Sequence, residues 1–518
     1  MRAPTAKLII AVTLIAAWRV PRCQAQTRDE ALQSGIHAFQ SHNFAAAEKA
    51  FTQLVHLDPS ARNYDYLAAA EVAGGKLDRA IADFQKSILL GNHSASVHYD
   101  LGLAYVQWGV AETALEQFRK AVSLDPNYLP ARYALGMTML RMGQAREAAG
   151  IFAGAHRQAP RDPRIWAAWV EAEFAAADSQ QATATARDAI AAAPNNPRLA
   201  VTLAGDCLRH HQVETARNLL EDANETMPQN PEIRILLAKC SLLAGEPVEA
   251  LAVLRDLPSA GKDHAERLQL TGEARALTGD LAAAQKDLAS AIKDAPNDAR
   301  YMTTYAWVQQ LQGQYNAAIA TLSKARALDP AAPIIPYRMA ISYYLLGQYA
   351  QGLKYCRAAL EANLNYGAAY FLLGITELKQ KDFKSSLDHL RRAVSLSPGE
   401  ALFHRELGEA LFQSGDSAAA IKELDAALSL NPEDAESYFW RARLRASEGA
   451  EQQAITDLNT AVELEPNYSD AYADLAQLYA KTGHPRQAAK ARAAQKQAHA
   501  SSKSSGASLV RSLPENPQ

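Results

Sequence analysis

The feature that most constrains this chain is a phrase that returns after a whole number of 34-residue steps. Residues 121–143 read AVSLDPNYLPARYALGMTMLRMG, and residues 461–483 read AVELEPNYSDAYADLAQLYAKTG. The two phrases lie 340 residues apart, which is ten steps. Nine prolines are separated by intervals of either 34 or 68 residues: Pro126, Pro160, Pro194, Pro228, Pro296, Pro330, Pro398, Pro432 and Pro466. Self-similarity at a fixed period predicts a repeat architecture, not the several separate domains that 518 residues would otherwise indicate.

Fourteen repeats fit the sequence when Pro126 is assigned to place 32 of a 34-residue unit. The first repeat then begins at residue 28, the last ends near residue 502, and the second repeat is one residue short. The hydrophobic fraction of 48% and the charged fraction of 21% are those of a globular chain that buries a core.

Four places in the repeat carry the packing information. Place 8 is Gly or Ala in every repeat except the fifth, which has Val170, and place 20 is small in all fourteen. Place 24 is usually large, as at Phe118 and Phe152, and place 15 is Gly in ten repeats. Small residues at places 8 and 20 allow two helices to approach closely beside the large residue at place 24. Glycine at place 15 suits a tight reversal that needs a positive φ.

The ends of the helices are also marked in the sequence. Pro at place 32 ends a helix because it cannot continue the hydrogen-bond ladder. The next helix opens on a capping residue followed by Pro, as at Asp162–Pro163, Asn196–Pro197 and Asn230–Pro231. Each repeat is therefore predicted to be a helical hairpin, and hairpins that cannot bury both faces alone must stack.

A 34-residue helical hairpin with small residues at places 8 and 20, a bulky residue at 24 and Pro at 32 resembles the tetratricopeptide repeat. The resemblance covers residues 26–502. It implies an all-α fold, a right-handed superhelical solenoid of tandem hairpins, and a role in binding other proteins through the concave surface.

The segments outside the regular repeats lead to separate expectations. In residues 1–25, two basic residues precede the apolar run LIIAVTLIAAW, and small residues at 23 and 25 suit cleavage, as in a secretory signal peptide. An uncleaved membrane anchor and a cytosolic protein are the alternatives, because Arg19 and Arg22 follow the apolar run. The mature chain would carry a formal charge of −7 instead of −3, without the basic field of a nucleic-acid surface.

Residues 503–518 are small and polar, and predict a disordered tail.

Irregular junctions and cysteines complete the domain description. Residues 257–264 contain Pro258 and Gly261 and lack the expected Pro at place 32, so we expect a shortened second helix and a hinge. Three cysteines remain in the mature chain. They are interpreted as small buried residues, with a disulfide between Cys207 and Cys240 as the alternative.

Catalytic and metal-binding motifs are absent from the sequence. No zincin, P-loop, dinucleotide-binding or nucleophile-elbow pattern occurs. His93, His98, His210 and His211 have no carboxylate or thiolate at metal-ligand spacing. His404 occupies the core-facing place 4, and too few residues follow the last repeat for a catalytic domain. We therefore expect no enzyme activity, no cofactor and no metal.

The candidate binding surface consists of places 2, 5, 9, 12 and 13 of the first helices, which we call the inner face. Members of the family that clamp a terminal carboxylate use Lys, Arg and Asn on this face, and other members carry an Asn ladder at place 6. This chain has no Asn at places 2, 6 or 9, which argues against both polar modes. Two apolar groups occupy the inner face instead and are our predicted partner-binding residues. The first group comprises Tyr99, Leu103, Val106, Tyr133, Met137 and Leu140. The second comprises Trp307, Tyr337, Ile341, Tyr344, Phe371, Ile375 and Leu378. The same side chains could instead be buried between neighbouring helices.

The inner face of repeats 12 and 13 is charged instead of apolar. We expect a solvated mixed-charge face there, formed by Arg405, Glu409, Glu436 and Arg443.

These observations predict an exported, non-catalytic scaffold for protein–protein contacts. The Ala-rich composition and the export signal favour a bacterial envelope or periplasmic setting, where members of the family assemble secretion, pilus or polysaccharide-export machinery. A co-chaperone-like binder of apolar peptides and the binding subunit of an enzyme complex, with catalysis in trans, are the alternatives. We expect a protein or peptide partner, no nucleic acid and no membrane span in the mature chain.

Overall fold

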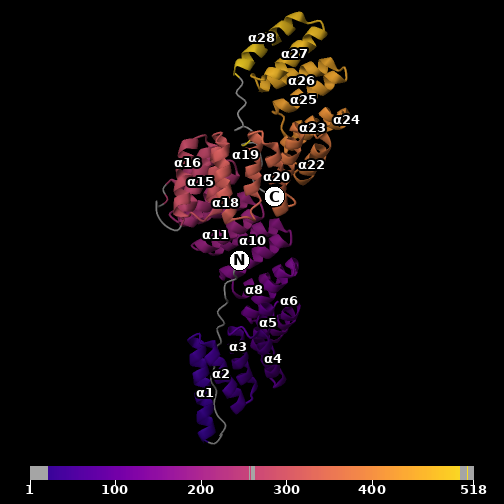
Figure 1. Ribbon diagram of the computed structural model, residues 1–518. Coiled ribbons are helices and arrows are strands. Elements are labelled where there is room, and N and C mark those ends of the chain that lie inside the picture. The colour runs from indigo at the N-terminus through magenta and orange to yellow at the C-terminus, as the bar shows by residue number, and fades with distance from the viewer. Residues whose placement is uncertain (1–21, 256, 258–262, 502–509, 511–518) are drawn as a thin grey trace. The chain divides into compact units, whose positions relative to one another are not determined.

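The computed structural model describes residues 22–255, 257, 263–501 and 510. In these residues all the regular secondary structure is α-helical, in 28 consecutive helices (Figure 1). Contacts divide the chain into two units, residues 1–236 and 237–518. Most of the predicted signal peptide lies outside the described residues; its last four residues belong to the first helix. None of the described helices is long and apolar enough to span a membrane.

The helices of the first unit are α1 (Arg22–Gln40), α2 (Phe44–Leu57), α3 (Ala61–Ala73), α4 (Leu77–Leu89), α5 (Ala95–Trp108), α6 (Ala111–Leu124), α7 (Leu129–Arg141), α8 (Ala145–Gln158), α9 (Pro163–Ala175), α10 (Ser179–Ala192), α11 (Pro197–Arg209) and α12 (Val213–Thr226). The unit boundary falls within α13 (Pro231–Leu243). The helices of the second unit are α14 (Pro247–Leu254), α15 (His264–Leu277), α16 (Leu281–Asp294), α17 (Ala299–Leu311), α18 (Tyr315–Leu328), α19 (Ile334–Leu345), α20 (Tyr349–Ala362), α21 (Gly367–Lys379), α22 (Phe383–Leu396), α23 (Ala401–Ser414), α24 (Ser417–Leu430), α25 (Ala435–Ser447), α26 (Glu451–Leu464), α27 (Ser469–Lys481) and α28 (Pro485–Ser501).

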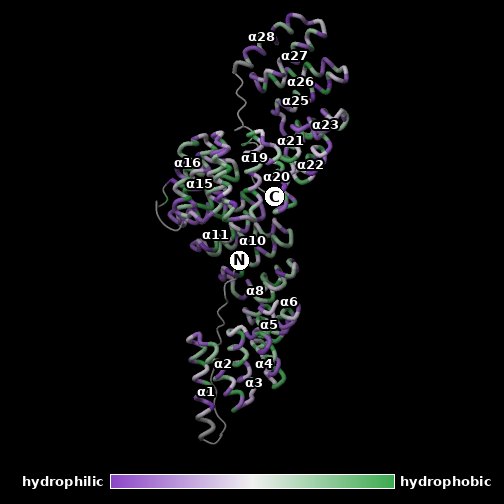
Figure 2. Tube along the Cα trace, viewed as in Figure 1, coloured by the Kyte–Doolittle hydropathy of each residue, from purple (hydrophilic) through white to green (hydrophobic). Residues whose placement is uncertain are grey.

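Within each unit the helices alternate as the repeat predicts. Odd-numbered helices are the first helices of the repeats, and even-numbered helices are the second. Second helices pack against the first helices of their own repeats, as α16 packs against α15 and α18 against α17. First helices of successive repeats also contact one another, as α17 contacts α15 and α19. Hydrophobic and hydrophilic residues alternate along the helices, as expected when each helix buries one face (Figure 2). The all-α array of tandem hairpins is confirmed.

The predicted helix starts are confirmed at two junctions. Helix α9 begins at Pro163, and the Asp162 side chain accepts a hydrogen bond from the Arg164 backbone N–H. Helix α11 begins at Pro197, and Asn196 caps it through the Leu199 backbone N–H. Proline, which lacks an N–H, occupies the first position, where a helix has no intrahelical acceptor for that group.

The reversal at place 15 adopts a left-handed backbone in all fourteen repeats. Ten of these residues are the predicted glycines, such as Gly143 with φ of 77°. The other four are His42, Ala177, His211 and Lys381, with φ between 57° and 62°. Because a side chain disfavours this conformation by about 1–2 kcal/mol, the turn itself must be imposed by the packing of the two helices. His211 is therefore a turn residue in this structure.

The close approach of the two helices in a hairpin is confirmed at places 8 and 24. A Cβ atom added at Gly102 would lie 2.6 Å from Phe118 Cε1, and one at Gly136 would lie 2.7 Å from Phe152 Cζ. The fifth repeat reverses the sizes, because Val170 at place 8 accompanies Ala186 at place 24, and both side chains are fully buried. In this repeat the larger side chain therefore lies on the first helix and the smaller one on the second helix.

The junction in repeat 7 differs from the others. Helix α14 has eight residues, whereas a second helix such as α16 has fourteen. This agrees with the expected shortening before Pro258. Residues 256 and 258–262 lie outside the described residues, so the hinge remains a prediction.

Replacing Gly136 with Ala should lower the free energy of unfolding by about 1–3 kcal/mol, because the new methyl group overlaps the Phe152 ring. Gly150→Ala, in helix α8 of the same repeat, is the matched control. Nothing lies within 4 Å of the Cβ position there, so the helix should gain up to about 1 kcal/mol from the better helix former. Urea unfolding followed by circular dichroism measures both effects. Equal effects of the two substitutions would contradict the proposed packing.

Candidate partner-binding surface

The first predicted group lies on α5 and α7 and is half-buried. Tyr99, Leu103, Tyr133 and Met137 each keep part of their surface exposed while packing against the core of repeats 2–5. The Tyr99 ring meets Tyr128 edge-on, with the ring centroids 5.5 Å apart. This part of the inner face therefore offers accessible aromatic and aliphatic surface.

Two carboxyl groups lie on the helices of this region, Asp65 on α3 and Asp100 on α5. Burial raises the pKa of Asp65 to about 6, although hydrogen bonds from Ser87 and Asn92 lower it. Burial, and then the charge of Asp65, raise the pKa of Asp100 to about 7. A carboxyl group removed from water without a compensating cation keeps its proton to a higher pH. Asp100 is therefore about half protonated near neutral pH.

Asp100→Asn should stabilise the chain at pH 8 by about 1–3 kcal/mol and have little effect at pH 4. Between about pH 4 and pH 7 the folded chain binds a proton at Asp100 that the unfolded chain has released, so stability falls as pH rises through this window. The exposed Asp188, on α10, is the control, and its replacement by Asn should change stability by less than about 0.5 kcal/mol. Urea unfolding at the two pH values measures the difference. A constant effect of Asp100→Asn with pH would contradict the assignment.

The second predicted group lies in the packed interior of the second unit. Trp307 is 3% exposed, and Tyr337, Ile341, Phe371, Ile375 and Leu378 are also buried. Tyr344 alone of this group is half-buried. These residues come from α17, α19 and α21 and form one contiguous hydrophobic cluster. Their assignment to partner binding stays a prediction.

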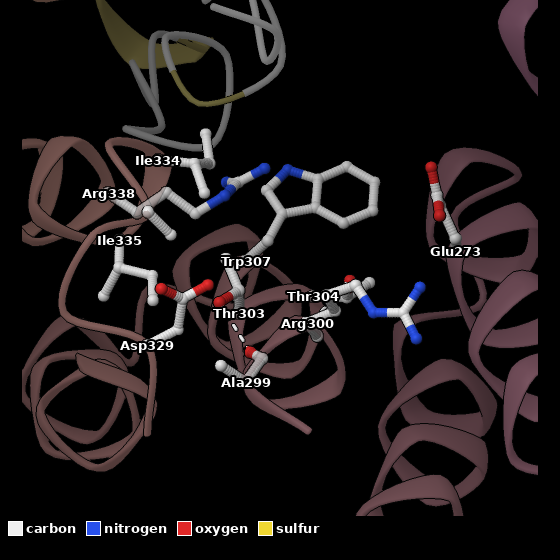
Figure 3. A pocket seen from close by; sticks show the side chains of 11 residues that line it. Glu273, Ala299, Arg300, Thr303, Thr304, Trp307, Asp329, Ile334, Ile335 and Arg338 are labelled. Carbon is white, nitrogen blue, oxygen red and sulfur yellow. Dashed lines mark hydrogen bonds between the residues drawn. The ribbon is translucent and has the colours of Figure 1, made fainter. Parts of the chain in front are cut away.

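A cavity of about 200 Å³ adjoins this cluster on the inner face of α15, α17 and α19. It is lined by Glu273, Ala299, Arg300, Thr303, Thr304, Trp307, Asp329, Ala332, Ile334, Ile335 and Arg338. Figure 3 shows the Arg338 guanidinium beside the Trp307 indole, and Glu273 separated from both across the cavity. The lining is therefore mixed, with one indole and four aliphatic side chains beside four charged residues and two threonines.

Polar contacts link α17 to α19, two of the helices that line the cavity. The Gln310 side-chain amide donates to the Arg338 carbonyl at 2.7 Å and to Ser342 Oγ at 2.8 Å, and its oxygen accepts from Arg338 at 3.3 Å. The Arg338 guanidinium carbon lies 5.7 Å from the centre of the Trp307 ring. The buried Trp307 Nε1 has no hydrogen-bond acceptor among the described residues. A buried indole N–H without an acceptor is costly.

Sequence reasoning found Trp307 but missed the polar residues around it. Arg338 occupies place 6 and Glu273 place 9, where only Asn was sought. The sequence did contain a signal for Arg338. It is charged at place 6, whereas the next repeat has the apolar Leu372 at the same place.

The expected solvated face of repeats 12 and 13 is wrong for Arg405 and Glu409. Arg405 forms ion pairs with Glu406 at 3.0 Å, Asp434 at 3.1 Å and Glu436 at 3.3 Å, and its side chain is mostly buried. Glu409 is also buried, and burial followed by the charge of Glu406 raises its pKa to about 7. Neighbouring first helices approach closely enough to exclude water from these side chains, which alternation along one helix does not reveal.

Histidines and cysteines take structural positions. His404 Nδ1 lies 2.7 Å from Glu423 Oε2, and His98 Nδ1 lies 2.8 Å from Gln117 Oε1, so place 4 links the first helix to the second in both repeats. Cys207, Cys240 and Cys356 are all buried. Among the described residues no group of three or more His, Cys, Asp or Glu side chains could hold a metal ion.

Comparisons with known proteins agree on one family. Three family models, each described as a tetratricopeptide repeat, match residues 32–88, 67–128, 109–169, 207–274, 337–401, 405–469 and 458–490. No curated protein matches the sequence.

Three similar solved structures illustrate the range of the matches. One chain of the APC/C hetero-tetramer Cut9–Hcn1 is 14% identical to this protein. The match covers 88% of this chain and 97% of that chain, with a TM-score of 0.48. MamA is 21% identical over 32% of this chain and 92% of its own, with a TM-score of 0.31. YrrB, described as a tetratricopeptide repeat protein with an unusual peptide-binding site, is 22% identical over 36% of this chain and 96% of its own, with a TM-score of 0.31.

Together the matched segments cover residues 32–169, 207–274, 337–401 and 405–490, which is more than half of the chain. The chain therefore belongs to the tetratricopeptide repeat family, and its architecture is that of a scaffold for protein–protein interaction.

Proposed function

We propose that this chain is a non-catalytic scaffold that binds an extended segment of a partner protein along the inner face of repeats 8–10. The observation that carries this proposal is the cavity between α15, α17 and α19, which is lined by Trp307, whose buried indole N–H has no acceptor in the described part of the chain. A peptide supplies what this site lacks, because each of its residues brings both a side chain and a carbonyl oxygen.

The size of the cavity favours a peptide anchor over a cofactor or a small-molecule substrate. Sites for such molecules usually enclose about 300–1,000 Å³. The cavity here has about 200 Å³ and suits one or two side chains of a longer ligand. The rest of such a ligand would lie along neighbouring first helices, as in groove recognition of peptides.

The polar groups at the cavity favour a peptide ligand with an extended backbone. Trp307 Nε1 can donate to a peptide carbonyl, and the exposed Arg300 and the acidic Glu273 present opposite charges at the same cavity. Ile334 and Ile335 supply apolar contact. Such a mixture of an apolar floor and a few oriented polar groups gives a peptide site its specificity.

The N-terminal sequence supports an exported scaffold in a bacterial envelope, where it would take part in assembling secretion, pilus or polysaccharide-export machinery. Residues 1–25 have the basic, apolar and small-residue sections of a signal peptide. N-terminal sequencing of the chain recovered from bacterial periplasm should begin at Gln26, and a chain that begins at Met1 would contradict the proposed processing.

Peptides selected from a displayed random library against the full chain should bind Trp307→Phe about 2–12-fold more weakly than the unmodified chain. This is the loss expected for one hydrogen bond when the aromatic ring is kept. Trp440→Phe is the matched control, because Trp440 also has a buried indole N–H without an acceptor among the described residues but does not line the cavity. Fluorescence anisotropy with labelled peptides measures the dissociation constants. Equal binding by all three proteins would contradict the proposed site.

A further inference from the structure

The inner face of the first unit carries an accessible apolar patch on α5 and α7. Leu103 and Val106 on α5, and Met137 and Leu140 on α7, are all half-buried above the core of repeats 2–5. They occupy places 9 and 12 of two first helices that contact each other. Equivalent places on contacting helices lie side by side, so the four side chains form one patch. Such a patch is typical of a surface that another molecule covers.

Tyrosine rings border this patch toward the start of the two helices. Tyr99 and Tyr133 occupy place 5 of α5 and α7, and Tyr128 directly precedes α7. All three side chains are half-buried. The Tyr99 and Tyr128 rings meet edge-on, with an angle of 80° between their planes. A half-exposed tyrosine offers apolar contact to a ligand and, over its ring face, a position for a cation.

Two carboxyl groups lie beside these rings. After burial, the charge of Asp100 is the next largest cause that raises the pKa of Tyr99 and of Tyr128, so Asp100 faces both tyrosines. Asp65, on the preceding first helix α3, acts in the same way on Asp100. Helices α3 and α5 contact each other, as do α5 and α7. The apolar patch, the two rings and the two carboxyl groups therefore belong to one surface of three consecutive repeats.

The carboxyl group of Asp100 lacks the compensation that a similar group receives elsewhere in the chain. Asp457, on α26, is 3% exposed and accepts hydrogen bonds at 2.7 Å from both Arg441 and Arg445. Asp100 has no such partner in the part of the chain that the structure describes, and the nearby charge that acts on it is the negative charge of Asp65. A carboxylate removed from water is stabilised by a cation, so this surface is complementary to a positively charged ligand.

We infer that the inner face of repeats 2–4 is a second binding surface, which takes a basic and apolar segment of a partner protein. Asp65 and Asp100 bind a lysine or arginine side chain, Tyr99 and Tyr128 contact it through their rings, and its aliphatic neighbours cover the patch on α5 and α7. A free inorganic cation would leave the apolar patch in water, and an acidic segment would be repelled. This surface lies in the first unit and does not depend on the cavity at Trp307.

The test uses peptides selected at pH 8 from a displayed random library against the full chain. One group of these peptides should bind Asp100→Asn at least about tenfold more weakly than the unmodified chain, the loss expected for one hydrogen-bonded ion pair. Each peptide of this group should contain Lys or Arg beside an aliphatic or aromatic residue. Asp188→Asn, at an exposed aspartate of α10, should bind the group as the unmodified chain does. Fluorescence anisotropy measures the dissociation constants, and circular dichroism checks that the variants keep their helicity.

The dependence of binding on pH separates a direct contact from a structural role of Asp100. With a pKa of about 7, Asp100 is about one-tenth ionised at pH 6 and about nine-tenths ionised at pH 8. Asp65, with a pKa of about 6, changes in the same direction, while Lys and Arg of the peptide stay charged. The group should therefore bind the unmodified chain about tenfold more tightly at pH 8 than at pH 6. Most of this difference should disappear in Asp100→Asn.

Three results would overturn the inference. They are a selection without any peptide that depends on Asp100, a dependent group without Lys or Arg, and affinity that does not rise between pH 6 and pH 8. Peptides that depend on Trp307 should bind Asp100→Asn normally, so equal weakening of all peptides would also overturn it. If peptides depend on Trp307 and none on Asp100, the proposed function stands and the second surface is excluded. The reverse result keeps the second surface and excludes the site in repeats 8–10.

Discussion

The structure depends on the contact between the two helices of each hairpin at places 8 and 24. In repeats 3 and 4 a glycine faces a phenylalanine ring so closely that no Cβ atom fits between them. This approach fixes the spacing of the helices, and the spacing in turn imposes the left-handed residue at place 15, even where that residue is alanine or lysine. Each hairpin then presents its first helix in a constant orientation. The inner face is a consequence of this repetition, since the same places of successive first helices lie side by side.

The inner face has different chemical properties in the two units. In the first unit, Tyr99 and Tyr133 are half-buried, and the nearby carboxyl groups of Asp65 and Asp100 have raised pKa values. In the second unit the corresponding aromatic residues are buried, and beside them lies a cavity lined by Trp307, whose indole N–H has no acceptor among the residues that the structure describes. A scaffold with one fold can thus carry surfaces of different selectivity, because the repeat fixes where side chains lie and leaves their identity free.

Features that repeat every 34 residues could be predicted from the sequence, and features that arise from single contacts could not. The hairpins, their caps at Asp162 and Asn196, and the small residues at places 8 and 20 follow from the local spacing of residue types. The burial of Tyr337 and Phe371 depends on how neighbouring repeats close over them, which no single repeat encodes. The ion pairs of Arg405 join α23 to the start of α25.

The central claim is that the inner face of α15, α17 and α19 carries a site for an extended segment of a partner protein. Hydrogen exchange measured by mass spectrometry on the full chain tests this directly, because a bound peptide suppresses local opening of the helices beneath it. The account predicts slower exchange in α15, α17 and α19 when a library-selected peptide that depends on Trp307 is bound, with unchanged exchange in α5 and α7. Identical exchange in α15, α17 and α19 with and without the peptide would contradict it.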